Sequence, residues 1–188
     1  MPKQNITKEM IVEAAFEIAR NGGMEQVMVK NIADKLHCSV QPIYSYCTNI
    51  EGLRNDVIER VKQFVNDYAI EHIDKNNLFR STGSMYVQLA KEEPNIFKMY
   101  ILHERIGIAS LSDLYASETN PNVADFIAEK LNISVENARQ LHLNMLIYTV
   151  GIGTIYSVSI PGISTDEILE QQGFAYQAFL KHILEGDD

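Results

Sequence analysis

Apolar residues along this chain recur every three to four positions, and strict apolar–polar alternation is absent over any useful length. That period is typical of amphipathic α-helices and not of β-strands. The first helix is expected to begin after Thr7, an N-cap residue, with Ile6 and Ile11 placed as a hydrophobic staple. The pattern predicts about nine helices, near residues 8–21, 29–36, 40–47, 49–73, 82–91, 94–107, 121–131, 135–159 and 165–184.

Capping residues mark several of the expected helix starts. Thr48 and Glu51 have the spacing of a capping box, and so do Ser164 and Glu167. Segment 109–120 is a long connection with only a weak apolar pattern, and we expect it to be mobile. The fold class predicted from these features is all-α.

Composition limits the number of domains and the kinds of partner. The chain has 188 residues, 46% of them hydrophobic, which is enough for one core or for a small head joined to a larger body. Its formal net charge is -9, and residues 1–62 contain eight basic and eight acidic side chains, so the excess acid lies beyond them. Indiscriminate coating of nucleic acid or anionic membranes is therefore excluded, and any nucleic-acid contact must be local.

Two features bear on the compartment. Cys38 and Cys47 are too few for a disulfide framework, and the N-terminus lacks an apolar signal core, so we expect a cytoplasmic protein. No residue between Arg139 and Asp166 carries a formal charge, which raises the question of a membrane span. Polar residues dilute this stretch, so we expect a helix buried in a core or between subunits, and no membrane partner.

Motifs of enzymes and metal sites are missing from the sequence. It contains no nucleophile elbow, zinc-protease motif, phosphate loop or dinucleotide fingerprint. None of its five histidines has the spacing of metal ligands. We therefore expect no catalytic residues, no metal and no cofactor.

The first three expected helices have the spacing of a helix-turn-helix head. Ile11, Ala15, Ile32 and Ile43 supply apolar positions for a shared core, with a tight turn between the second and third helices. In this geometry the third helix enters the major groove of DNA with its N-terminal residues leading. We expect this head at residues 1–47, and a helical ligand-binding and dimerisation domain at residues 48–188 that starts with the long helix near 49–73.

Specific residues of the head match a known family. The segments Val29-Lys30-Asn31-Ile32-Ala33, Ser39-Val40-Gln41-Pro42-Ile43-Tyr44-Ser45-Tyr46 and Thr48-Asn49-Ile50-Glu51-Gly52-Leu53 resemble the tetracycline-repressor (TetR) family of bacterial transcriptional regulators. The resemblance covers roughly residues 7–61. It implies a homodimer that binds a palindromic double-stranded DNA operator, and a C-terminal domain that binds a small-molecule effector of unknown identity and thereby releases DNA.

The resemblance also implies roles for individual residues. Gln41 can pair with adenine, and Val40 and Pro42 can contact a thymine methyl group, whereas hydroxyl groups can donate to phosphate. Alternatives remain for three of these residues, because Ser39 can serve as a helix cap, Tyr44 can belong to the core of the head and Gln41 can be a solvated side chain. The residues expected to contact DNA are Lys30, Ser39, Val40, Gln41, Pro42, Tyr44, Ser45, Tyr46 and Thr48.

The remaining helices are rich in aromatic residues and methionine, most of which a helical body needs for its core. An apolar pocket is expected among the helices near 61–68, 85–104 and 141–148. Its expected lining residues are Phe64, Tyr68, Tyr86, Tyr100, His103, Met145 and Tyr148. Dimerisation is expected through the last two helices. Its expected residues are Met145, Thr149, Ile152, Tyr156, Phe174, Gln177, Ala178 and Leu184.

Two other classes of function stay open. Ile50 stands where the family usually has a phosphate-binding lysine, and His37 and Met28 replace its usual glycine and threonine. The first alternative is thus a helical ligand-binding or interaction protein whose head does not read DNA. The second alternative is an all-helical enzyme, for which turnover dependent on His103 or His142 would be required.

Overall fold

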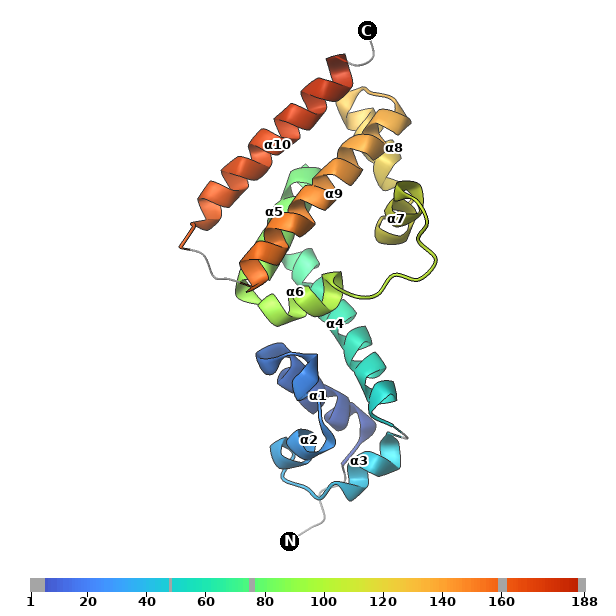
Figure 1. The fold of residues 1–188 in the computed structure, drawn as a ribbon, viewed down its shortest axis with the longest axis vertical. Helices are drawn as coiled ribbons and strands as arrows, with labels where there is room; N and C mark the ends of the chain where they lie inside the picture. The colour runs from blue at the N-terminus through green and yellow to red at the C-terminus, as the bar shows by residue number, and fades with distance from the viewer. Residues whose placement is uncertain (1–5, 48, 75–76, 159–161, 186–188) are drawn as a thin grey trace. The chain divides into compact units, whose positions relative to one another are not determined.

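The structure is a computed structural model, which describes residues 6–47, 49–74, 77–158 and 162–185. These residues form ten α-helices and one short 3-10 helix, and no β-strand occurs among them (Figure 1). The predicted all-α fold is therefore confirmed. The elements are α1 (Lys8–Gly22), η1 (Met24–Gln26), α2 (Val29–Lys35), α3 (Gln41–Tyr46), α4 (Ile50–His72), α5 (Leu78–Glu92), α6 (Pro94–Ile101), α7 (Leu111–Glu118), α8 (Val123–Leu131), α9 (Val135–Val158) and α10 (Thr165–Glu185).

Local signals place both ends of α1. The Thr7 hydroxyl accepts a hydrogen bond from the backbone N–H of Met10 at 3.3 Å, as expected of the N-cap. Ile6 and Ile11 are both buried, in agreement with the predicted staple. After Gly22 the chain turns at Gly23, whose φ of +89° is one that residues with a side chain rarely adopt.

By its contacts the chain divides into two compact units. The first consists of residues 1–72 and 92–103, and the second of residues 73–91 and 104–188. The first unit is larger than the expected head, because α4 and α6 both pack on α1 and on each other. The functional boundary expected at residue 47 stays a prediction.

In the first unit, α1 is the central element. Its residues Ile11, Ala15 and Phe16 are fully or almost fully buried, and α2, α3, α4 and α6 all contact this helix. The short helices α2 and α3 would not persist alone, since helices below about 12 residues are marginal in water. Ile32 of α2 and Ile43 of α3 are both completely buried, so packing on α1 stabilises them.

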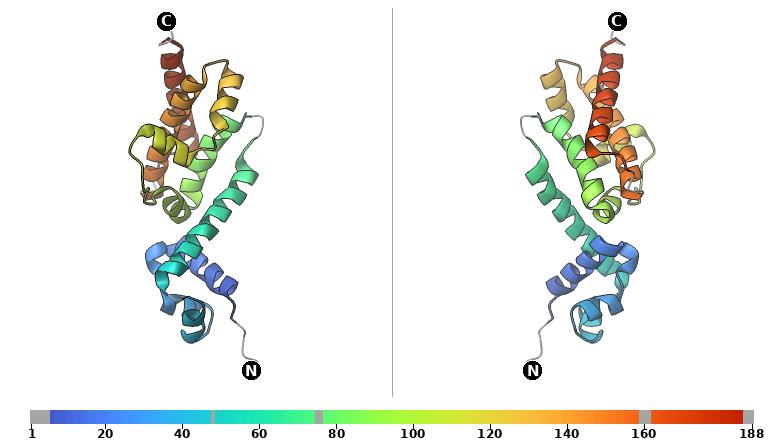
Figure 2. Two further views of the ribbon diagram at one scale, coloured as in Figure 1. Left: turned by 90° about the vertical axis from the view of Figure 1, so that its right-hand side faces the viewer. Right: turned by 90° about the vertical axis from the view of Figure 1, so that its left-hand side faces the viewer.

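In the second unit, α9 lies against both α8 and α10, and α9 and α10 run antiparallel (Figures 1 and 2). A buried polar pair joins these two helices, because Gln172 Nε2 donates a hydrogen bond to Thr149 Oγ1 at 2.9 Å. Helix α5 approaches the same pair closely: a Cβ atom on Gly83 would lie 2.7 Å from Gln172 Nε2. The register of α5, α9 and α10 is therefore specified by this contact.

Three of the expected elements differ from the structure. Helix α5 begins at Leu78 instead of near residue 82. The segment 109–120, expected to be a mobile connection, contains α7, which Ser110 caps by accepting from the N–H of Asp113 at 3.1 Å. Helix α6 ends at Ile101 instead of near residue 107. Leu102 and Ile106, which would continue its apolar stripe, are exposed and have no core to pack against, so the helix stops.

Helix α9 is long and apolar enough to cross a membrane by length and composition, and it alone is so among the described helices. The core helix of a soluble protein meets the same criterion, and this fold is compatible with a soluble protein. Of the most apolar part of α9, 39% is buried. Its outer side, with Ile147, Ile155 and Val158, is exposed in the single chain.

Candidate functional site

Helix α3 presents nearly all of its side chains to solvent. Ile43 is its one buried residue, and it anchors the helix to α1 and α2. Tyr44 is 60% exposed, which answers the question left by the sequence: this tyrosine is not part of the core. Pro42 is half-buried, and the other expected DNA-contacting residues that the structure describes are exposed, namely Lys30, Ser39, Val40, Gln41, Tyr44, Ser45 and Tyr46. Thr48 lies outside the described residues.

The turn between α2 and α3 spans residues 36–40. His37 has a φ of +51°, the left-handed conformation that favours glycine and that asparagine, aspartate and histidine tolerate better than most residues. The N-cap of α3 is Val40, not Ser39, and no side chain caps this helix. Ser39 therefore does not cap α3, and its side chain is exposed.

Beside the C-terminus of α3 lies a hollow of about 320 Å³. Lys8 and Asp56 form an ion pair of 2.9 Å in its wall. Asn49 accepts a hydrogen bond from Gly52 N–H at 2.7 Å in the first turn of α4. Burial raises the pKa of Cys47 in the same wall, which keeps this thiol protonated near neutral pH and unreactive.

Most cationic side chains of the first unit are already paired with carboxylates. Lys8, Arg20, Arg54, Arg60 and Lys62 each form an ion pair within this unit. In the described part of the first unit, Lys30 and Lys35 of α2 are exposed and form no such ion pair. Half-buried Lys98 of α6 also lacks an ion pair among the described residues, so the exposed unpaired lysines of this unit are those on α2, next to the exposed α3.

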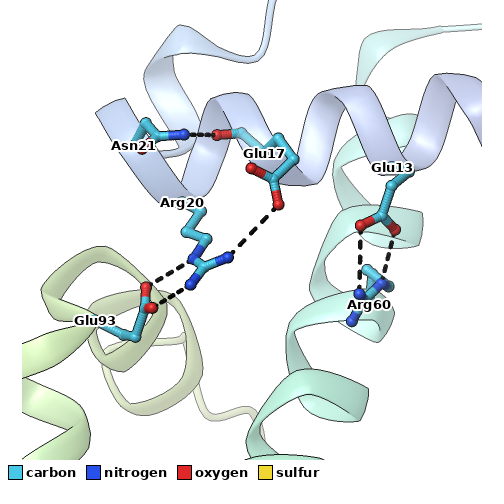
Figure 3. A network of polar contacts seen from close by, with 6 residues as sticks. All are labelled: Glu13, Glu17, Arg20, Asn21, Arg60 and Glu93. Atoms are coloured by element: carbon cyan, nitrogen blue, oxygen red, sulfur yellow. Dashed lines mark hydrogen bonds and ion pairs between the residues drawn. The ribbon is translucent and has the colours of Figure 1, made fainter.

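A polar network fixes α1 to α4 and α6 (Figure 3). Arg20 donates to both carboxylate oxygens of Glu93, and Arg60 donates to both of Glu13. The Arg20 guanidinium also lies 5.1 Å from the centre of the Phe64 ring. The pKa of Arg20 is raised, first by its hydrogen bond to Glu93. These bidentate contacts hold α1, on which α2 and α3 pack, in one orientation within the first unit.

The residues expected to line a ligand pocket fall into both units. In the first unit, Tyr68 donates to Glu92 at 2.7 Å and stacks on His72, and its pKa is raised by burial. Exposed His103 contacts the Tyr100 carbonyl. The first unit holds Phe64, Tyr68, Tyr100 and His103, and the second holds Tyr86, Met145 and Tyr148. A pocket shared by these seven residues stays a prediction.

The residues expected at a dimer interface divide between two sides of α9 and α10. Met145, Thr149 and Tyr156 are buried within the single chain, where Tyr156 donates to the Ile163 carbonyl. Ile152 is half-buried, and the outward-facing members of the set are Phe174, Gln177, Ala178 and Leu184. Apolar spacing marks both sides of a helix such as α9, and it cannot tell the inner side from the outer one.

The structure brings together one pair of residues that the sequence did not single out as a site. The Tyr115 hydroxyl of α7 lies 3.0 Å from Nδ1 of His142 on α9, and the two rings meet edge to face. Burial lowers the pKa of His142 to about 4, so its ring is neutral at pH 7. The residues are 27 positions apart, and only a polar residue on an apolar helix hinted at this contact.

Comparisons with known proteins add no assignment. No family model matches the chain, and no curated protein matches it either. The functional assignment therefore depends on the geometry described above and on the resemblance of the head residues.

Proposed function

We propose that the protein is a ligand-responsive transcriptional regulator, a repressor, that binds a palindromic operator as a homodimer in the cytoplasm. In this proposal α1, α2 and α3 form a helix-turn-helix head, and α3 is the recognition helix in the major groove. A small molecule bound in the C-terminal helices releases DNA. No catalytic activity is assigned to the chain.

The observation that carries the proposal is the exposure of α3. A short helix that buries Ile43 alone leaves Gln41, Tyr44 and Tyr46 free for a partner. Neighbouring exposed apolar and aromatic side chains commonly mark an interaction site. Gln41 in the first turn is placed to pair with a base edge, while the tyrosine hydroxyls can donate to phosphate.

The turn before α3 and the charge beside it agree with this role. His37 adopts the left-handed conformation at the position where the TetR family commonly has glycine. Lys30 and Lys35 provide charge for the phosphate backbone. With these two lysines in each protomer, a dimer would contact about four phosphates, and the salt dependence of log K would have a slope of about -3.6.

The proposed dimer forms through the outer side of α9 and α10. Ile147, Ile155 and Val158 recur on one side of α9 at helical spacing, and Phe174 and Leu184 are exposed on α10. Packing of two such helix pairs would form a four-helix contact between protomers. Ligand binding would then change the separation of the two recognition helices from the roughly 34 Å between successive major grooves on one DNA face.

Selection of bound sequences from a random DNA library, at low and at moderate salt, tests the proposal. We expect an enriched palindrome. Gln41→Ala should relax base preference at one position in each half-site. Lys30→Gln should weaken binding to all sequences and reduce the salt slope by about 0.9 for each phosphate that the variant no longer neutralises. Lys130→Gln, the same charge change at an exposed residue of α8 outside the proposed dimer interface, is the matched control and should leave binding unchanged.

One observation favours a second candidate. Most cations of the first unit are engaged with carboxylates, which suits a helical interaction protein whose head does not read DNA. Library selection separates the two. If no palindrome is enriched and Gln41→Ala changes nothing, the regulator proposal fails and the interaction protein remains.

A further inference from the structure

Helix α7 is held on the second unit in an unusual way. None of its eight residues is buried. Arg105 donates to Glu118 at 2.5 Å, which closes the segment that contains α7 onto itself. The hydrogen bond between Tyr115 and His142 joins this closed segment to α9. Segments with few buried contacts open at low free-energy cost, so α7 can leave the unit without disrupting its core.

The Tyr115 ring packs on the ring of His142, which packs in turn on a second aromatic ring. His142 meets the Tyr115 ring at 5.4 Å between centres with an interplanar angle of 87°, and it meets Phe79 of α5 at 5.6 Å and 69°. Phe79 packs in turn against the core cluster of the second unit. Edge-to-face contacts of this kind favour one flat aromatic ring over an aliphatic group of similar size.

The same site selects for a hydroxyl group. Burial keeps His142 neutral at pH 7, and in the tautomer that leaves Nδ1 without hydrogen this atom accepts from the Tyr115 hydroxyl at 3.0 Å. A ring without a hydroxyl would leave this half-buried nitrogen without its partner. The site therefore requires a flat ring that has a hydroxyl donor para to its other substituent. A phenol meets this requirement.

We propose that Tyr115 acts as an internal stand-in for a ligand, and that a small phenolic compound takes its place on His142 Nδ1 while α7 moves away. The inference deepens the proposed function, on which it rests for any effect on DNA, by naming the chemical class of the effector. Phenol binding itself requires no DNA, so it can be measured separately.

The test uses full-length protein, isothermal titration calorimetry and two probes. The first is 4-methylphenol, which reproduces the tyrosine side chain, and the second is toluene, which lacks the hydroxyl. Tyr115→Ala should bind 4-methylphenol about tenfold more tightly than toluene, because the hydrogen bond to Nδ1 separates the two probes. It should also bind 4-methylphenol at least tenfold more tightly than the wild type, in which Tyr115 competes.

Further variants keep the test decisive. Tyr115→Phe retains the ring and should bind 4-methylphenol more tightly than the wild type, which decides the matter if Tyr115→Ala does not fold. His142→Phe should abolish the preference for 4-methylphenol. Tyr176→Phe, which removes a hydroxyl from another aromatic ring that packs on Phe79, is the control and should bind as the wild type does.

Hydrogen exchange of the wild type reports the movement of α7. Saturating 4-methylphenol should speed exchange at residues 111–118 and leave that of α9 unchanged. Equal affinity for the two probes in folded Tyr115→Ala and Tyr115→Phe, or slower exchange of α7 with ligand, would overturn the proposal. Such a result would leave library selection on DNA unaffected, so failure here and failure of the proposed function can be told apart.

Discussion

Acid should destabilise this protein through His142, beginning at a higher pH than that at which ordinary carboxylates titrate. Burial lowers the pKa of this histidine from 6.5 to about 4 in the folded chain. Between these two pH values the unfolded state binds a proton that the folded state does not bind. The free energy of unfolding must therefore fall as pH falls through this window. Well above pH 6.5, His142 is neutral in both states and this loss of stability is absent.

The size of the effect follows from the lowered pKa. Each tenfold change in proton affinity corresponds to about 1.4 kcal/mol, so the full difference between the two states is about 3 kcal/mol. Between pH 7.5 and pH 4.5 about 2.5 kcal/mol of it should be lost. This is a large share of the 5–15 kcal/mol that is typical of folded domains, as an order-of-magnitude comparison.

Urea denaturation followed by circular dichroism, at one fixed protein concentration and at pH values from 7.5 to 4.5, measures this loss. His142→Gln is the matched variant, because its amide can still accept from Tyr115 and does not titrate. Its stability should change little over the same range, apart from effects shared with the wild type. If the wild type and His142→Gln gave parallel pH profiles, the neutral buried histidine would be refuted.

Three further predictions concern packing, charge and association. Gly83→Ala should destabilise the fold by about 1–2 kcal/mol in thermal or urea unfolding, because the added Cβ would displace Gln172 from its buried hydrogen bond to Thr149. Gly173→Ala is the control: a Cβ at this position would meet no atom within 4 Å, so the variant should stabilise the fold by up to about 1 kcal/mol. Arg20→Met should cost about 1 kcal/mol in urea unfolding, and 1 M salt should reduce that difference; an unchanged midpoint would show that the pair with Glu93 contributes nothing. Phe174→Glu should convert the proposed dimer to a monomer in sedimentation, and a variant with the same mass as a dimeric wild type would place the interface elsewhere.

Several features of the fold could be predicted from the sequence because they depend on neighbours within about four residues. Thr7, Ile6 and Ile11 specify the start of α1, and Gly23 specifies its end. Helix propensity and apolar spacing likewise placed α2, α8 and α9 within two residues of their observed bounds. Exposure of Gln41 followed from the same spacing, since Ile43 takes the inward position of α3.

Other features were decided by tertiary structure, because they join residues far apart in the chain. The early end of α6 reflects the absence of a surface to bury Leu102 and Ile106, which no local pattern encodes. Arg20 and Glu93 are 73 residues apart, and Tyr115 and His142 are 27 apart. Periodicity tells which residues of a helix share a side, whereas the partner that covers that side is chosen only when distant helices pack together.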